Sequence, residues 1–171
     1  ATTLSTAGDA FLPRVAFDAA GNATVIWMAS ENNISNLWAS RYTAASRTWS
    51  APLRVVSSAS VATGVSTPDL AVDGQGNAIV TWYQGDGRTN HFDVWAVKYA
   101  ALSGAWGAPF MVSDGVNSAA NSHVAVNAAG QGLIAWVQQQ GDGTTVSNGP
   151  QDIYGRSVTT GAGAWGPRAM L

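Results

Sequence analysis

The sequence contains no cysteine, and only 11% of its 171 residues are charged. The missing cysteine excludes disulfides, thiolate chemistry and the common cysteine-containing zinc sites. Eight basic and ten acidic side chains give a net charge of -2, which is too little positive charge for a surface that binds nucleic acid. No apolar run approaches the roughly 18 residues of a membrane-spanning helix. Nucleic-acid binding and membrane insertion are therefore both disfavoured.

Straight-chain residues that favour helices are scarce as well. Lys98 is the only lysine and Glu31 the only glutamate, whereas alanine, glycine, serine and threonine are abundant. A hydrophobic fraction of 46% and eight tryptophans are typical of a globular domain. The composition therefore argues against a helical protein. Because the chain begins at Ala1 and not at methionine, we expect an upstream segment to have been removed and an extracellular or periplasmic location.

The chain contains an internal repeat of about 55 residues. Residues 13–27 align without gaps with residues 68–82 and 122–136. Two further similar blocks follow each copy. The first block lies at 37–42, 94–99 and 153–158, and the second begins at Trp49, Trp106 and Trp165. All eight tryptophans occupy positions within these repeated blocks. Such self-similarity is typical of stacked units, none of which can bury its own faces alone.

Each unit is predicted to contain four short strands, because four segments are apolar or alternating and rich in β-branched and aromatic residues. In the first unit these segments are residues 14–18, 23–29, 37–42 and 49–56. The first connection fits a tight hairpin in which Asp18 accepts hydrogen bonds from the turn backbone and Gly21 adopts the left-handed conformation. The same turn recurs in the other two units, at 73–77 and 127–131.

Tandem units of four antiparallel strands predict an all-β fold, a β-propeller in which each sheet packs face to face on its neighbours. The motifs Ala-Phe-Asp-Ala-Ala-Gly-Asn-Ala at 16–23 and Trp-Ser-Ala-Pro at 49–52 resemble the repeats of sialidase-like propellers and of secreted bacterial propeller-repeat proteins. The sialidase Asp box, Ser-x-Asp-x-Gly-x-x-Trp, is not matched, because Trp27 follows Gly21 by six residues and not by three. The resemblance therefore implies the fold without sialidase activity.

Three blades cannot close a propeller, which needs about four to eight of them. The predicted division of the chain is a joining segment at 1–12 followed by blades at 13–67, 68–121 and 122–171. The number of residues from Trp49 to Pro68 equals the number from Trp165 of one chain to Pro13 of a second copy placed directly after it. We therefore predict a homodimer in which two chains join head to tail into a six-bladed ring. The alternative is that the chain is part of a longer repeat array.

One position of the repeat carries a different polar residue in each copy, namely Arg14, Asp69 and His123. In propellers of the families that the chain resembles, the loops that enter the innermost strands and the loops between second and third strands share one face. The resemblance therefore places these residues at the mouth of the central channel, beside the three long variable loops. Variable groups on a rigid frame are reasonable ligand-binding positions. A hydrated ring of ion pairs around the channel is the alternative interpretation.

The long loops of the same face supply further candidates. Side chains in the loops at 31–36 and 88–93 are of the kinds that hydrogen-bond sugars. The candidate ligand-binding residues are Arg14, Asp69, His123, Glu31, Asn33, Arg88, Asp93 and Asp152. Glycoside hydrolysis needs two carboxylates, for which Glu31, Asp69, Asp93 and Asp152 are available. No motif marks any of them, so no catalytic residue is assigned.

No metal site and no cofactor are predicted. His123 could bind a metal ion, but one histidine without a motif is insufficient, and His91 is expected to face solvent from a long loop. The Gly-Asp-Gly runs at 85–87 and 141–143 lack the regular acidic spacing of a calcium-binding loop. No nucleophile motif such as Gly-x-Ser-x-Gly is present.

The leading functional prediction is a secreted, non-enzymatic, lectin-like module that binds carbohydrate at the loop face of a propeller. The alternatives are a glycosidase-like propeller enzyme and a scaffold that docks proteins. The predicted partners are a second copy of the same chain and a glycan.

Overall fold

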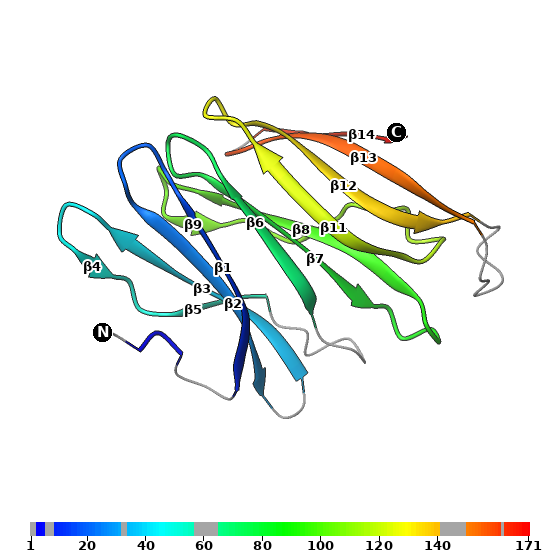
Figure 1. The fold of residues 1–171 in the computed structure, drawn as a ribbon, viewed down its shortest axis with the longest axis horizontal. Helices are drawn as coiled ribbons and strands as arrows, with labels where there is room; N and C mark the ends of the chain where they lie inside the picture. Colours follow the sequence, from blue (N-terminus) through cyan, green and yellow to red (C-terminus); the bar gives the residue numbers. More distant parts are fainter. Residues whose placement is uncertain (1–2, 6–8, 32–33, 57–64, 141–149, 162) are drawn as a thin grey trace.

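The computed structural model describes residues 3–5, 9–31, 34–56, 65–140, 150–161 and 163–171. Within these ranges the chain forms three antiparallel sheets that lie side by side (Figure 1). Among the described residues, no helix has the length and apolar character needed to cross a membrane.

Each sheet is one copy of the sequence repeat. The first contains β1 (Ala10–Phe17), β2 (Ala23–Glu31), β3 (Ile34–Thr43), β4 (Thr48–Trp49) and β5 (Leu53–Val56). The second contains β6 (Ser66–Val72), β7 (Ala78–Gly85), β8 (Phe92–Ala100), β9 (Ala105–Trp106) and β10 (Phe110–Met111). The third contains β11 (Ala119–Val126), β12 (Gln131–Gln139), β13 (Gln151–Thr159) and β14 (Trp165–Met170).

The predicted four-stranded units are confirmed, with one difference at the outermost strand. In the first two sheets this strand is split into two short pieces, β4 with β5 and β9 with β10, and all four pieces pair with the third strand of their sheet. Pro52 and Pro109 lie between the pieces and have no N–H to donate to a ladder. In the third sheet Pro167 lies inside β14 without dividing it, and the pairing register shifts there, between Arg156 and Val158 of β13. Proline thus disturbs the outermost strand of each sheet, where it is tolerated because that strand lies at the sheet edge.

The hairpin turns form as the sequence predicts. Asp18 Oδ1 accepts hydrogen bonds from the backbone N–H groups of Ala20 and Asn22, both at 2.9 Å. Gly21 has a φ of 78°, in the left-handed region that glycine adopts without strain. Asn22 then accepts a hydrogen bond from the N–H of Ala44 at 3.0 Å, which joins this turn to the hairpin between β3 and β4.

The core lies between the sheets. Ile26, Met28 and Leu37 of the first sheet pack against the second sheet in one cluster of buried side chains, which includes Trp82. Ile79 and Val94 of the second sheet, and Ile134, Trp136 and Val158 of the third, belong to the other cluster. The second sheet therefore buries both of its faces, and each outer sheet packs against a neighbour on one face only.

The outer faces of the first and third sheets carry exposed apolar side chains. Leu133 and Ile153 of the third sheet are 44% and 49% exposed, whereas their repeat equivalents Ile79 and Val94 are fully buried between sheets. Phe17, on the first sheet, is 65% exposed. Positions that the repeat buries in the middle of the array are thus uncovered at its ends, as expected of an incomplete stack.

Candidate functional site

The three variable polar residues lie on the innermost strands, each directly after a β-bulge. The pairing register shifts between Phe11 and Arg14 in β1, between Ser66 and Asp69 in β6, and between Ala120 and His123 in β11. β1 contacts β6, and β6 contacts β11, so the three strands succeed one another across the molecule (Figure 1). A bulge bends a strand and redirects the side chains that follow it.

Each bulge contains a non-glycine residue with positive φ. The values are 50° at Leu12, 40° at Thr67 and 53° at Asn121. A branched side chain such as that of Thr67 is strained in this region by about 1–3 kcal/mol. The same strained geometry therefore recurs before Arg14, Asp69 and His123. It could not be found from the sequence, because no glycine marks it.

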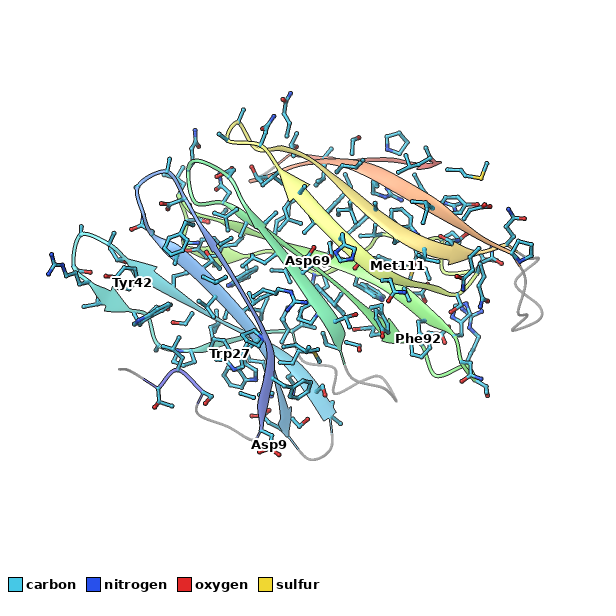
Figure 2. The ribbon with its side chains drawn as sticks, in the orientation of Figure 1. Asp9, Trp27, Tyr42, Asp69, Phe92 and Met111 are labelled. Carbon is cyan, nitrogen blue, oxygen red and sulfur yellow. The ribbon has the colours of Figure 1, made fainter. Side chains whose placement is uncertain are left out.

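Asp69 and His123 form a pair across two innermost strands. Asp69 Oδ2 lies 3.3 Å from His123 Nδ1 and accepts a hydrogen bond from the backbone N–H of Val124 at 3.0 Å. The Asp69 side chain is 23% exposed and that of His123 is 83% exposed. Figure 2 labels Asp69 between β6 and β11. The carboxylate thus holds one ring nitrogen of a histidine that is otherwise open to solvent.

Arg14 does not join this pair. Its Nη1 donates to the carbonyl of the adjacent Pro13 at 3.1 Å. Within the described part of the chain, Asp69 and His123 form the one ion pair that links innermost strands. The alternative interpretation, a ring of ion pairs around the channel, is therefore represented by one contact among the described residues.

Three other predicted candidates have partners in their own sheets and loops. Glu31 pairs with Arg54 at 3.2 Å, and Asp152 accepts a hydrogen bond from the Gln140 amide. Arg88 is bound to Asp86 in the loop between β7 and β8. Asn33 lies outside the described residues.

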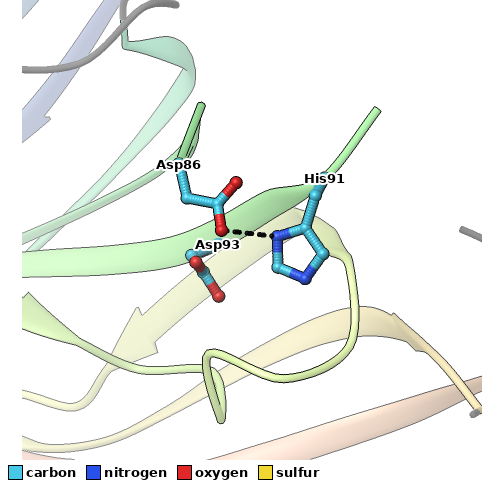
Figure 3. Close-up of side chains that lie close together, drawn as sticks. All are labelled: Asp86, His91 and Asp93. Atoms are coloured by element: carbon cyan, nitrogen blue, oxygen red, sulfur yellow. Dashed lines mark ion pairs between the residues drawn. The ribbon is translucent and has the colours of Figure 1, made fainter. Parts of the chain in front are cut away.

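The expectation that His91 faces solvent is wrong. His91 is 5% exposed and Asp93 is 2% exposed, and with Asp86 they form a compact cluster at the loop between β7 and β8 (Figure 3). His91 Nδ1 lies 3.2 Å from Asp86 Oδ2, and Nε2 lies 3.1 Å from the carbonyl oxygen of Val116. Segment 113–118, which precedes β11, covers the histidine, and this long-range contact leaves no local signal in the sequence.

The carboxyl groups of this cluster have opposite pKa shifts. Burial raises the pKa of Asp93, and this effect outweighs the hydrogen bond that its Oδ1 accepts from Ser113 Oγ at 2.9 Å. For Asp86, burial also acts to raise the pKa, but hydrogen bonds from Arg88 and electrostatic attraction to His91 and Arg88 outweigh it, so the pKa is lowered. The negative charge of Asp93 is thus poorly compensated by its present neighbours.

A hydrogen-bonded network that the sequence analysis missed supports the third sheet. Trp136 Nε1 donates to Gln138 Oε1 at 2.9 Å, and Gln138 Nε2 donates to Asp114 Oδ2 at 2.6 Å. Arg168 pairs with the same Asp114 carboxylate at 3.1 Å. The repeated spacing Trp-x-Gln at 82–84 and 136–138 is the signal that would have revealed it. This network fixes the end of β12 and does not form an open site.

Comparison with solved structures identifies the fold. An α-L-arabinanase of Penicillium chrysogenum complexed with arabinobiose matches 94% of this chain with a TM-score of 0.59 and 15% identity. The polysaccharide lyase Uly1 matches 93% with a TM-score of 0.62 and 10% identity. An α-L-arabinofuranosidase of Fusarium graminearum in complex with an iminosugar inhibitor matches 94% with a TM-score of 0.55 and 11% identity.

The chain has the β-propeller fold. Its three sheets are blades, and they span between 40% and 50% of the chains of these three structures. The described part of the protein is thus a partial propeller that needs completion. The sialidase-like character of the repeats stays a prediction. No protein-family model and no curated protein matches the sequence.

The same comparison corrects the leading functional prediction. The three structures are an α-L-arabinanase, a polysaccharide lyase and an α-L-arabinofuranosidase, all of which are enzymes. This finding contradicts the prediction of a non-enzymatic, lectin-like module and fits its glycosidase-like alternative better. The prediction went wrong because it took the absence of a catalytic motif as evidence against an enzyme.

Proposed function

We propose that this protein is part of a propeller enzyme that cleaves glycosidic bonds in a polysaccharide. The observation that carries the proposal is the Asp69–His123 pair, which lies at the bulged ends of two innermost strands. A partly exposed carboxylate paired with a largely exposed histidine can exchange protons with a bound sugar chain.

Backbone strain at this site supports the same proposal. Strained residues persist where the surrounding structure imposes them, and they concentrate at active sites. Thr67 and Asn121 adopt positive φ two residues before Asp69 and His123, respectively.

Hydrolysis is the first candidate reaction. Asp69 would act as the general acid or base, as carboxylates do in glycoside hydrolases. Arg14, on the innermost strand of the first blade, would bind the substrate. A polymeric substrate that cannot enter a cell is consistent with an extracellular or periplasmic location.

Elimination is the second candidate, and one observation favours it. Asp69 is the single carboxylate on the described innermost strands, whereas hydrolysis needs two carboxylates. A carboxylate bound to one nitrogen of His123 leaves the other nitrogen to remove a proton from the substrate. In a uronic-acid polymer, removal of the proton next to the carboxyl group forms a carbon–carbon double bond as the bond between the neighbouring ring carbon and the glycosidic oxygen breaks. The departing oxygen takes a proton from water, which leaves an unsaturated sugar.

We further propose that a second copy of the chain completes the ring. The exposed Leu133 and Ile153 of the third blade would then be covered as Ile79 and Val94 already are in the second blade. Closed two-fold assemblies are the commonest way to cover such faces.

A product assay tests the proposed activity. The protein is incubated with arabinan and with uronic-acid polysaccharides, and both new reducing ends and the ultraviolet absorbance of unsaturated sugars are measured. Hydrolysis yields reducing ends alone, and elimination yields both signals. Asp69→Asn is expected to lower the rate by about 100-fold or more in either case. Glu31→Gln, a carboxylate change at an ion pair away from the axis, is the matched control and is expected to retain the rate. Activity that survives Asp69→Asn would contradict the assignment of the site.

A further inference from the structure

The cluster of Asp86, His91 and Asp93 has the composition and the geometry of a metal site. One potential ligand atom from each of the three side chains lies within 4.8 Å of the others. Ligands bound to zinc at about 2.0–2.2 Å in a tetrahedron lie roughly 3.3–3.6 Å apart, so side-chain movements of about an ångström would bring these atoms into place. Figure 3 shows the three side chains facing one another.

The histidine supplies an independent indication. Its Nε2 lies 3.1 Å from the Val116 carbonyl oxygen, which can only accept a hydrogen bond, so Nε2 carries the proton. In a neutral ring, Nδ1 then carries a lone pair that faces the two carboxylates. Nδ1 is buried and has no hydrogen-bond partner, although Asp86 Oδ2 is 3.2 Å away. A metal-binding histidine usually donates its other ring N–H to a carboxylate, a backbone carbonyl or water, and Nε2 of His91 has such a partner.

We propose that Asp86, His91 and Asp93 bind a divalent transition-metal ion, with Zn²⁺ as the preferred ion. One imidazole nitrogen and carboxylate oxygens suit zinc better than calcium, which takes oxygen ligands. The site is separate from the Asp69–His123 pair and does not depend on the proposed enzymatic activity.

The position of the site indicates a structural role for the ion. Asp86 and His91 lie in the loop between β7 and β8, and Val116 lies in the segment between the second and third blades. Arg88 ties the same two segments together, because its Nη2 donates to the Gly115 carbonyl at 2.9 Å. A bound ion would therefore fasten a long surface loop of one blade to the connection that leads into the next.

The positively charged guanidinium of Arg88 opposes binding of the metal ion. The Nε of Arg88 contacts Asp86 Oδ2, the oxygen that also faces His91. Zinc must compete with this guanidinium for the oxygen. The variant Arg88→Gln is therefore expected to bind zinc more tightly than the wild type.

Zinc titration of the chelator-treated protein tests the proposal by isothermal calorimetry, with Co²⁺ absorption as a second probe of nitrogen and oxygen ligation. One ion per chain is expected, with a rise in melting temperature of roughly 5–10 °C at a free zinc concentration 100 times the Kd. Asp86→Asn and His91→Gln are each expected to weaken binding by about 10- to 100-fold or more. Asp86 is partly exposed, so its variant should fold even if the His91 variant does not.

His123→Gln provides the matched control, because His123 is the other histidine and also lies beside a carboxylate. Zinc binding should be unchanged in this variant. Three results would overturn the proposal: no zinc binding by the wild type, binding that survives Asp86→Asn unaltered, or binding that is lost with His123→Gln.

Discussion

Single residues decide the hairpin turns, and these were predictable because their chemistry is local. Asp18, Asp73 and Asn127 occupy the same turn position, and each accepts hydrogen bonds from the backbone two and four residues later. Burial and strain at the candidate sites were not predictable in this way. Thr67 adopts positive φ without a glycine signal, and His91 is buried by residues distant in sequence.

Asp73 is expected to make folding stability depend on pH. Its burial acts to raise the pKa, but hydrogen bonds from Thr160, Asn77 and the backbone of residue 75 outweigh this effect and lower the pKa below the ordinary 3.8. A pKa that is lower in the folded state contributes stability above pH 3.8, and this contribution is lost as the pH falls through the folded value. Acid therefore weakens the fold through this group.

The variant Asp73→Asn tests this expectation by chemical unfolding across the acid range. Asparagine already serves at the equivalent position 127, so the turn should persist. Stability near neutral pH should fall by about 1–2 kcal/mol, because hydrogen bonds to a charged acceptor are stronger than those to a neutral one. The variant should also lose less stability on acidification than the wild type. Equal losses in the two proteins would show that Asp73 does not contribute.

At the scale of the elements, cation–π contacts join the blades in sequence. Arg41 of β3 lies 4.5 Å from the ring centroid of Tyr99 in β8, and its repeat equivalent Lys98 lies 4.3 Å from that of Trp165 in β14. Strand number and order followed from the alternating repeat. The cation–π contacts could not be predicted from the repeat, because a basic residue in a strand is equally consistent with a solvent-exposed side chain.

Removal of the first of these contacts should destabilise the chain measurably. Arg41 also donates to the Gly76 carbonyl in the second blade, at 3.0 Å. Arg41→Met is therefore expected to cost about 1–3 kcal/mol in unfolding free energy. Arg54→Met removes an exposed ion pair with Glu31 and should cost less than about 1 kcal/mol. Equal costs in urea unfolding would contradict a role for Arg41 in blade packing.

At the scale of the whole molecule, the sequence repeat predicts the propeller and its incompleteness, because both depend only on counting four-stranded units. The proposed activity was not predictable, because single-residue differences among repeats carry no label for catalysis. The exposed apolar faces of the first and third blades are the physical consequence of an open ring.

Sedimentation equilibrium directly tests the claim that these faces meet those of a second copy. A particle of twice the mass of one chain is expected at micromolar concentration. Leu133→Asp, on the open face of the third blade, should shift the particle to the mass of one chain. Leu102→Asp, at a fully exposed turn position, should not. A wild-type protein that sediments as a single chain at every concentration would contradict the claim.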